Sequence, residues 1–518
     1  RLGFSPETLS VAAGEEVVRF RLRAAPLSLE GLVAVGERSF SAASSEVIRD
    51  VDIQIRPRES SQELLRLAPG LVIAQHGGGG KPEQIFLRGF DADHGTDVAV
   101  SVDGTPVNLV SHGHGQGYAD LHFLLPEVVE QVDVRKGPYS PEDGDFATAG
   151  AVAFRTRDRL PGGSVSARVG SFGNRRVLAM IPAGGGQGGA GGYVAAAFQH
   201  SDGPFEHPDD YRRANLFARG TVPLAGAELV LTASGYDAEW DASGQLPLRA
   251  VRAGTIGRFG TLDPSEGGST GRYALGVGAR SPSGSELRWD ARAYAVRYRL
   301  RLFSNFTFFL ADSVNGDGIE QVDDRWLAGA QAAYARTSRP FGRPGSSTLG
   351  VGARGDFADV ELHHQRGRER LGSRVSARVR QRHLFTWAGQ EIDLGERVRL
   401  QLGVRGDLFR FGVRDRLGGE SGESWHGIVS PKASVAVAAG AGATLFGNLG
   451  SGFHSNHARD VVLAAPGDRV LPRALGAEAG GRYTWKRGSV AASLWAIDLE
   501  SELVYVGDEG VTEPSGPT

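Results

Sequence analysis

The chain contains no cysteine, one methionine and, among 57 lysine and arginine residues, only four lysines. Without cysteine there is no disulfide framework, thiol nucleophile or zinc–thiolate site. The net charge is −3 and no basic block is present, so we expect no nucleic-acid partner. Nucleophile-elbow, Walker and His-Glu-x-x-His motifs are also missing. We therefore expect a protein that is not an enzyme and that needs no cofactor.

The sequence also lacks long hydrophobic runs. No window approaches the roughly 18 consecutive apolar residues that a membrane-spanning helix needs. Any membrane span must therefore be built from the strands of a barrel. The 75 glycines show no Gly-X-Y period, and their density fits short strands and tight turns.

Short strands and glycine turns follow one another between Ile85 and Arg157. Alternating valines from Val98 to Val102 predict a strand, and Asp103-Gly104 predicts the turn that reverses it. A second enforced turn is expected at Lys136-Gly137-Pro138. The residues that we expect to shape this unit are Arg88, Gly89, Asp103, Gly104, Lys136, Gly137, Pro138, Gly144 and Gly150.

This unit resembles the plug domain of TonB-dependent outer-membrane receptors. Four family motifs occur in order and at the family spacing, in the segments Leu87–Phe90, Val100–Val107, Val129–Gly144 and Ala149–Thr156. Each motif alone is common in β-rich proteins, and an unrelated small α+β domain is the alternative. The order and spacing of all four favour the plug.

After Arg157, apolar and polar residues alternate over stretches of about ten positions, as lipid-facing barrel strands do. A soluble sandwich or propeller shows the same alternation, but aromatic residues near many strand ends favour a membrane barrel. The predicted fold is mainly β: a transmembrane antiparallel β-barrel, about 22 strands in the family and roughly 15 here, around an N-terminal α+β plug. The 15 candidate strands are 164–170, 176–181, 193–199, 213–221, 228–236, 273–280, 287–299, 326–336, 348–357, 375–387, 397–411, 430–438, 444–453, 474–485 and 489–505.

Short and long connections alternate between these strands. Periplasmic turns of such barrels are short and outer loops are long, so we expect the long segments to form the ligand-facing mouth. An odd strand number predicts that C-terminal strands lie outside this sequence. The sequence starts without a methionine or a signal peptide, which predicts that an N-terminal stretch lies outside it as well. The expected outer loops are 237–271, 303–324, 361–374, 414–427 and 454–473.

The N-terminal residues are interpreted from resemblance and position. The first residues resemble the last strands of a carboxypeptidase-regulatory-like β-sandwich. Leu32, Val33, Ala34 and Val35 occupy the place of the TonB box, which pairs with TonB by strand addition; an ordinary strand or linker is the alternative. The expected domains are residues 1–28 (end of the sandwich), 29–50 (TonB box and linker), 51–158 (plug) and 159–518 (barrel).

Histidines are the candidate binding residues. Imidazoles at several positions can ligate a transition metal or its chelate, although without thiolates a closed structural site is not expected. Hydrogen bonding inside a polar lumen is the competing interpretation, and the metal stays unknown. The acidic segment 312–320 lacks calcium-loop spacing and is interpreted as an outer loop. The candidate ligand-binding residues are His94, His112, His114, Gln116, His363, His364, His454 and His457.

The family resemblance implies a function. It implies TonB-dependent active transport of a scarce ligand, a ferric siderophore or another metal chelate, across the outer membrane of a Gram-negative bacterium. The implied partners are TonB, outer-membrane lipid and the imported small-molecule chelate. The alternative is a passive plugged channel or a surface-binding barrel without energy coupling.

Overall fold

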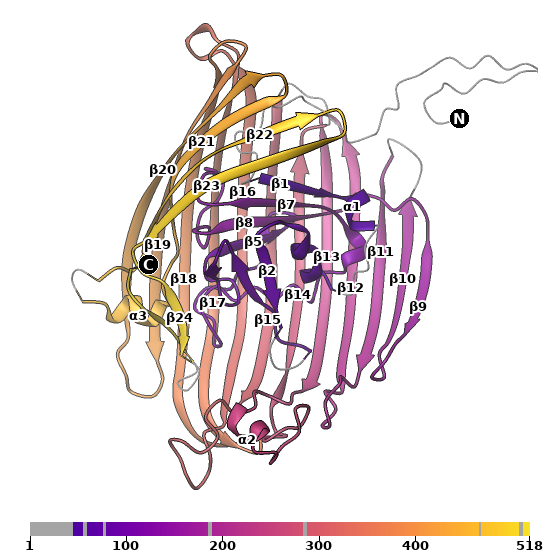
Figure 1. Ribbon diagram of the computed structural model, residues 1–518, viewed down its shortest axis with the longest axis vertical. Coiled ribbons are helices and arrows are strands. Elements are labelled where there is room, and N and C mark those ends of the chain that lie inside the picture. The colour runs from indigo at the N-terminus through magenta and orange to yellow at the C-terminus, as the bar shows by residue number, and fades with distance from the viewer. Residues whose placement is uncertain are drawn as a thin grey trace, which may run out of the picture. The chain divides into compact units, whose positions relative to one another are not determined.

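The computed structural model describes residues 45–54, 60–75, 79–184, 189–282, 287–465, 468–506 and 511–517. The predicted sandwich tail and the predicted TonB-coupling residues Leu32–Val35 lie outside these ranges. Within them, a large curved sheet surrounds a smaller N-terminal unit, the plug, drawn in indigo at the centre of Figure 1.

The large sheet has 15 strands, and each strand pairs antiparallel with its neighbours in the sequence. This confirms the predicted strand number. The first and last strands form the two edges and do not pair with each other, so the sheet is open within the described ranges. The strands are β9 (Ser164–Val169), β10 (Arg175–Gly184), β11 (Gly191–Ser201), β12 (Tyr211–Leu224), β13 (Ala227–Asp241), β14 (Gly267–Arg280), β15 (Leu287–Ser304), β16 (Ile319–Ser338), β17 (Gly345–Arg366), β18 (Glu369–Asp393), β19 (Val398–Asp415), β20 (Gly422–Gly440), β21 (Ala443–Phe453), β22 (Arg473–Trp485) and β23 (Gly488–Leu499).

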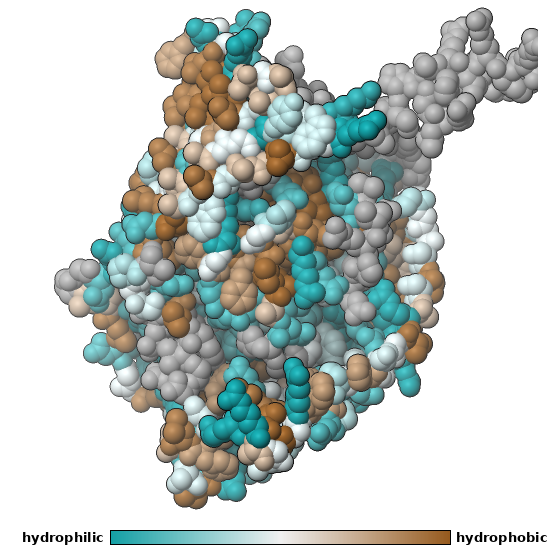
Figure 2. Space-filling view, in the orientation of Figure 1, coloured by the Kyte–Doolittle hydropathy of each residue, from teal (hydrophilic) through white to brown (hydrophobic). Residues whose placement is uncertain are grey.

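Side-chain alternation decides which face of each strand meets the plug. On β12, Tyr211, Arg213 and Phe217 point inward and are buried, whereas Arg212 and Leu216 point outward and are exposed. Successive side chains of a strand point to opposite faces, so one sequence builds a polar and aromatic inner face and a separate outer face. In Figure 2, hydrophobic and hydrophilic residues both occur along the outer margin, and hydrophilic residues are frequent near the centre.

Long connections lie at one end of the sheet. They include residues 242–266, which contain α2 (Leu248–Arg252), and 454–472, which contain α3 (Ala458–Leu463). Helix α2 is seen at the bottom of Figure 1. Connections at the other end, such as 225–226 and 441–442, are short; the one between β16 and β17 holds the 3-10 helix η3 (Pro340–Gly342).

One predicted outer loop is wrong. Residues 361–374 form the paired ends of β17 and β18 rather than a loop, joined by the turn Gly367-Arg368 with φ of 57° and 70°. Two successive residues with positive φ give the tight hairpin turn that matches strand twist. Register shifts after Leu362 and His364 interrupt the alternation, which is why the sequence pattern concealed the strands.

The plug combines two small sheets with short helices. The order in its five-stranded sheet is β1-β7-β8-β5-β6; β5 and β8 are parallel and the other pairs antiparallel. The elements are β1 (Ser45–Arg49), α1 (Asp50–Gln54), η1 (Gln62–Leu67), β2 (Leu71–Ala74), β3 (Gln84–Leu87), β4 (Phe90–Asp91), β5 (Val98–Val102), β6 (Thr105–Pro106), η2 (Pro126–Val128), β7 (Val129–Lys136) and β8 (Gly150–Thr156). A separate hairpin pairs β24 (Leu503–Val506) with β25 (Val511–Pro514).

Backbone conformation explains two plug motifs. Arg88 and Gly89 have φ of 54° and 86°, so the Leu87–Phe90 motif is a strand, a turn and a second strand. Asp103 and Gly104, at 47° and 74°, turn β5 into β6. Both pairs place glycine where L side chains are strained.

One hydrophobic core joins the plug to the wall. Val132 and Phe154 of the plug sheet belong to the same buried cluster as Tyr193 and Tyr298 of the barrel strands. A second cluster packs α3 against the long-connection ends of β17 to β20. None of the helices in the described ranges is long and apolar enough to cross a membrane.

Candidate ligand-binding site and plug anchors

The apex of the plug is the segment 111–117. An isolated bridge pairs Leu109 with Tyr118 at its base. The Gln116 side chain accepts a hydrogen bond from the Ser111 N–H (2.6 Å) and donates one to the Ser455 carbonyl (2.6 Å). At Gly113 a Cβ would lie 2.7 Å from the Val322 carbonyl oxygen, so only glycine fits against the wall there. These contacts fix the apex between the wall and the β21–β22 connection.

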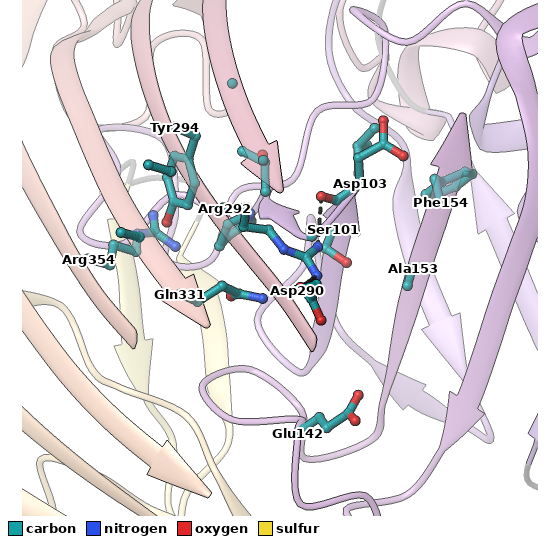
Figure 3. A pocket seen from close by; sticks show the side chains of 18 of the residues that line it. Ser101, Asp103, Glu142, Ala153, Phe154, Asp290, Arg292, Tyr294, Gln331 and Arg354 are labelled. Atoms are coloured by element: carbon teal, nitrogen blue, oxygen red, sulfur yellow. Dashed lines mark hydrogen bonds and ion pairs between the residues drawn. The ribbon is translucent and has the colours of Figure 1, made fainter. Parts of the chain in front are cut away.

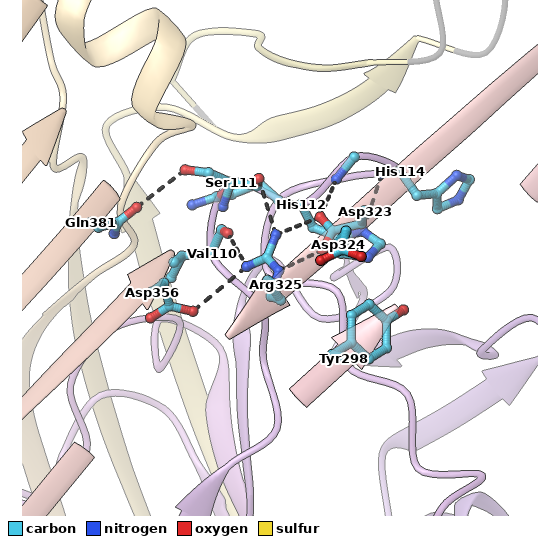
Figure 4. Close-up of polar contacts among 12 residues, drawn as sticks. Val110, Ser111, His112, His114, Tyr298, Asp323, Asp324, Arg325, Asp356 and Gln381 are labelled. Carbon is cyan, nitrogen blue, oxygen red and sulfur yellow. Dashed lines mark hydrogen bonds and ion pairs between the residues drawn. The ribbon is translucent and has the colours of Figure 1, made fainter. Parts of the chain in front are cut away.

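A buried ion pair of the wall holds this apex (Figure 4). The Arg325 guanidinium binds the Asp323 carboxylate through Nε (2.6 Å) and Nη2 (2.5 Å), and both side chains are fully buried. Arg325 Nη1 also donates to the Val110 carbonyl (2.7 Å), and Asp323 accepts from the Gly113 N–H (3.0 Å). One wall pair thus binds both a carbonyl and an amide of the plug backbone.

The same arrangement recurs on three further strands. In each case an arginine pairs with an aspartate two residues away on its own strand and donates to a plug carbonyl. Because alternate residues share a strand face, this spacing lets both groups point into the lumen. We call the four pairs the plug anchors: Asp290/Arg292 to the Asp103 carbonyl (2.9 Å), Asp323/Arg325 to Val110, Arg354/Asp356 to Asn108 (2.8 Å) and Arg405/Asp407 to Glu142 (2.9 Å).

The sequence alone did not identify the plug anchors. Their signal is an arginine and an aspartate at i and i+2 in an alternating strand, recurring on β15, β16, β17 and β19. Such spacing is common on the outer face too, and the partner on the plug is a backbone carbonyl, which carries no side-chain signature. Only the strand face separates an anchor from an ordinary surface pair.

The predicted plug-structural residues hold a further contact with the wall. Arg88 Nη2 binds the buried Glu478 carboxylate on β22 (3.0 Å), and its guanidinium lies 5.2 Å from the Trp495 ring centroid. Lys432 of β20 donates to the Pro138 carbonyl (3.0 Å). Other predicted residues work within the plug: at Gly150 a Cβ would lie 2.3 Å from the Arg135 carbonyl oxygen, leaving no room for a side chain.

Three of the predicted histidines cluster around Tyr118. The His112 ring stacks on Tyr118 (centroids 4.1 Å apart), while His114 and His94 approach it edge-on (5.6 and 5.8 Å). Burial lowers the pKa of His94 and His112 to about 3 and holds the pKa of His114 well below its usual range. The cluster is therefore neutral at physiological pH.

A pocket of about 360 Å³ adjoins this cluster at the long-connection end, and we call it the apex pocket. His112 and His114 contribute from the plug, and His457 and Arg459 from the start of α3. Burial also holds the pKa of His457 well below its usual range. The acidic lining residues are Glu361, Asp415, Glu420 and Asp460.

Local backbone contacts set which imidazole nitrogen carries the proton. Nδ1 of His112 accepts the His114 N–H (3.1 Å), and Nδ1 of His457 accepts the Arg459 N–H (3.2 Å). A neutral imidazole whose Nδ1 accepts must carry its proton on Nε2. Both rings are therefore N–H donors, and metal ligation through Nε2 would require breaking these bonds. These two imidazole N–H groups favour oxygen acceptors over a bare metal ion.

The other candidate residues lie apart from the apex pocket. His454 is fully buried and bonds Asp97 through Nδ1 (3.0 Å). His363 bonds Glu361 (3.0 Å), and His364 contacts the Gly316 carbonyl (2.7 Å). These two were expected in a loop, but they lie on β17. The structure thus brings His112, His114 and His457 to one pocket, with His94 behind His114.

Two acidic clusters outside the apex pocket already have partners within the protein. The Asp317 carboxylate accepts hydrogen bonds from backbone N–H groups of its own loop, including those of Leu310 (2.6 Å) and Asp312 (2.7 Å). Within the described ranges, one group of three could hold a metal, namely His200, Asp202 and Asp210. It contains none of the predicted histidines, and Asp210 already pairs with Arg212.

A second cavity, of about 770 Å³, lies between the plug sheet and the wall toward the short-turn end (Figure 3). Ser101, Asp103 and Glu142 line it from the plug, and Arg292 and Gln331 line it from the barrel. Three of the four plug anchors border it. Polar groups of both the plug and the wall therefore face this cavity.

Comparison with known proteins agrees with this architecture. A family described as "TonB-dependent Receptor Plug Domain" matches residues 38–151, and one described as "TonB dependent receptor-like, beta-barrel" matches residues 184–516. The second match alone spans more than half of the chain.

Similar solved structures are receptors and transporters. The unliganded ferric citrate transporter FecA shares 16% identity with a TM-score of 0.75, over 89% of this chain and 70% of that one. The ferric yersiniabactin uptake receptor FyuA from Yersinia pestis shares 16% identity with a TM-score of 0.68, over 88% of this chain and 72% of that one. The ferric-catecholate import receptor Fiu from K12 E. coli shares 14% identity with a TM-score of 0.71, over 92% of this chain and 76% of that one. At these identities the likeness establishes the fold alone.

Two neighbouring aspartates on β16, one in a buried ion pair and one in a partly exposed ion pair, allow a test of the plug anchors. Asp323→Asn leaves the buried Arg325 charge with only the more distant Asp356 (3.6 Å), and we expect a loss of about 3 kcal/mol in the free energy of unfolding. Asp324→Asn removes the partly exposed pair with Arg297 and should cost less than about 1 kcal/mol. Urea denaturation in detergent measures both, and equal losses would show that the buried pair is no anchor.

The neutral imidazoles predict acid sensitivity. The pKa of His112 is lower in the folded protein than in the unfolded chain, where it is about 6.5, so the unfolded chain binds the proton preferentially. The free energy of unfolding is therefore highest above pH 6.5 and decreases as the pH falls toward 3. His112→Gln should therefore reduce the stability lost between pH 6 and 5 by about 1 kcal/mol. Urea denaturation at both pH values measures this difference. An unchanged pH slope, or the same change in His200→Gln outside the cluster, would contradict it.

Proposed function

The chain belongs to the TonB-dependent receptor family, and from this premise we propose that it imports a ferric siderophore or a related metal chelate. Import takes place across the outer membrane of a Gram-negative bacterium, with energy supplied through TonB. The apex pocket receives the ligand from outside. The observation that carries the proposal is the pairing of two neutral imidazole N–H donors with Arg459 at the outer end of the lumen.

The donor set supports a chelate rather than a free metal ion. A metal already saturated by its chelator presents carboxylate, catecholate or hydroxamate oxygens, which accept hydrogen bonds. His112 Nε2 lies 3.8 Å from the Asp323 carboxylate, which is beyond hydrogen-bond distance, and Arg459 Nε is buried without a hydrogen-bond partner, so a ligand oxygen can satisfy either group. Unpaired buried donors are unfavourable, and their pairing contributes to affinity.

The plug anchors support a partial movement of the plug. Each anchor arginine keeps its own aspartate when the plug carbonyl leaves, so release exposes a neutral pair rather than an unpaired charge. Breaking a neutralised contact costs about one hydrogen bond, far less than separating a buried ion pair. Release of anchors between the apex pocket and the second cavity joins the two spaces into one passage.

TonB engages the residues ahead of the plug in this proposal. Leu32, Val33, Ala34 and Val35 offer an apolar segment for strand addition. Tension on this segment is transmitted to the plug sheet through β1, which pairs with β7. The lipid bilayer, TonB and the chelate are the partners that this mechanism requires.

Replacing residues 32–38 by glycine and serine tests the coupling. The change leaves the apex pocket intact, so we expect unaltered binding of the ferric chelate to cells and loss of its energised uptake. Cells expressing either form are given radiolabelled chelates singly, and bound and internalised label are separated.

The same replacement at residues 12–18 is the control and should import normally. Uptake that survives the replacement of 32–38 and withstands a proton uncoupler would indicate a passive plugged channel. Loss of binding would instead show that the segment supports the fold.

A His112→Ala/His457→Ala double variant tests the pocket. Removing two donors to a charged ligand should lower chelate affinity by about 100-fold, with binding of the uncomplexed metal ion unchanged. Isothermal titration with the purified chain measures both affinities. His426→Ala on β20, which does not line the apex pocket, is the matched control. The proposal fails if the double variant loses affinity for the bare ion but not for the chelate.

A further inference from the structure

One buried arginine of the lumen lies without a bound carboxylate. Arg272 is on the inner face of β14, where its register partners Tyr236 and Tyr298 are also buried. It is only 7% exposed, and it lines the second cavity. Its guanidinium lies 3.8 Å from the centroid of the Phe123 ring of the plug. Among the residues that the structure describes, its side chain forms no ion pair and no hydrogen bond.

The other buried arginines of the described ranges each have a polar partner within the protein. Arg213 donates to the Gln199 side-chain oxygen (2.5 Å). The rest bind carboxylates, and they are Arg176, Arg219, Arg325 and Arg405. Arg272 therefore differs from every other buried arginine that the structure describes.

The sequence of β14 explains this difference. In each plug anchor an aspartate lies two residues from the arginine, but the positions two residues from Arg272 hold Thr270 and Ala274. The charge of Asp120 acts on Arg272 from beyond ion-pair distance, and Oδ1 of Asp120 already accepts a hydrogen bond from the His122 N–H (2.8 Å). A buried guanidinium without a close counterion is unfavourable by several kcal/mol unless an anion meets it.

Small residues of the same strand leave room for such an anion. The inward residues that follow Arg272 toward the short-turn end are Ala274, Gly276 and Gly278, whereas Leu275 between them is exposed on the outer face. All three small residues line the second cavity, as Arg272 does. Its volume of about 770 Å³ is in the range that accommodates a small organic ligand.

The environment of the guanidinium favours a carboxylate over a phosphate. The Phe123 ring lies against one face of the group, and the N–H donors project from its edge, so a stacked arginine can still bind two oxygens in its plane. One such pair of donors matches a planar carboxylate. A phosphate has further oxygens to satisfy, and the side chains of Phe123 and Ala274 beside Arg272 carry no donor.

We propose that Arg272 binds a carboxylate group of a small organic anion in the second cavity. This site is separate from the apex pocket and lies further along the lumen toward the short-turn end. The inference rests on the proposed function where it identifies the anion as the imported chelate, which would occupy Arg272 after it leaves the apex pocket. Binding of the carboxylate itself requires only the cavity and the guanidinium.

Equilibrium dialysis of the purified full chain against radiolabelled tricarballylate, a small tricarboxylate, tests the site. The chain carries His112→Ala/His457→Ala, so that two donors of the apex pocket are absent. We expect saturable binding to this chain. Arg272→Gln in the same background should lower the affinity by about tenfold or more, because a charge-assisted pair of hydrogen bonds is lost.

Arg280→Gln is the matched control, because Arg280 lies on the same face of the same strand and lines the same cavity. Arg280 is already bound to Asp158 (2.7 Å) and Glu228 (2.6 Å), so its loss should change the affinity by less than about twofold. Arg272→Lys keeps the charge without the planar donors and should retain an intermediate affinity. Heat-modifiable migration checks that each variant retains its barrel.

Four results would overturn the inference. They are no saturable binding to the folded chain, equal loss of affinity in Arg272→Gln and Arg280→Gln, displacement by the uncharged triamide of the probe, and displacement by inorganic phosphate at an equal concentration. The assay contains neither TonB nor the two apex imidazoles. A failed import proposal therefore leaves carboxylate binding measurable, and absent binding leaves the apex pocket and the import proposal standing.

Discussion

Charge placed inside the lumen must be paired before the plug can dock, and the rest of the structure depends on this constraint. An isolated charge buried against the plug would destabilise the closed state by several kcal/mol. The wall meets the constraint on the strand itself: Arg325 and Asp323 are fully buried and share a face because they are two residues apart. Once neutralised in this way, the guanidinium has N–H groups left for plug carbonyls. The plug is therefore bound through its backbone by groups that stay compensated when it leaves.

The two faces of the wall apply the same rule differently. Inward pairs such as Arg354 and Asp356 are buried and bind the plug. Outward pairs such as Arg297 and Asp324 are partly exposed and compensate charge on the outer face of the wall. Strand alternation thus assigns two roles to one residue type: inward arginines bind the plug, and outward arginines pair with carboxylates on the outer face.

Much of the fold could be predicted from the sequence, because it follows from the alternation of inward and outward side chains along each strand and from the residues that favour tight turns. All 15 wall strands and the Asp103-Gly104 turn are local patterns. The ends of β17 and β18 were not predicted, because register shifts near His363 interrupt the alternation of apolar and polar residues. The candidate site was only partly predictable: the histidines at 112 and 114 are close in sequence, but their meeting with His457 depends on how the β21–β22 connection folds over the plug. The plug anchors depend on backbone carbonyls, which residue patterns do not mark.

The central claim is that import requires the plug apex to leave the wall while ligand binding does not. A crosslink measures this directly, because the chain has no cysteine of its own. The Ser111 hydroxyl lies 3.1 Å from the Gln381 side-chain oxygen, across the plug–wall boundary. Cysteines at these two positions, joined by a short thiol-to-thiol crosslinker, fasten the apex to β18. We predict that crosslinked cells bind the ferric chelate with unchanged affinity and cease to import it, while uncrosslinked cells import normally. Undiminished import through the crosslinked protein would contradict the claim.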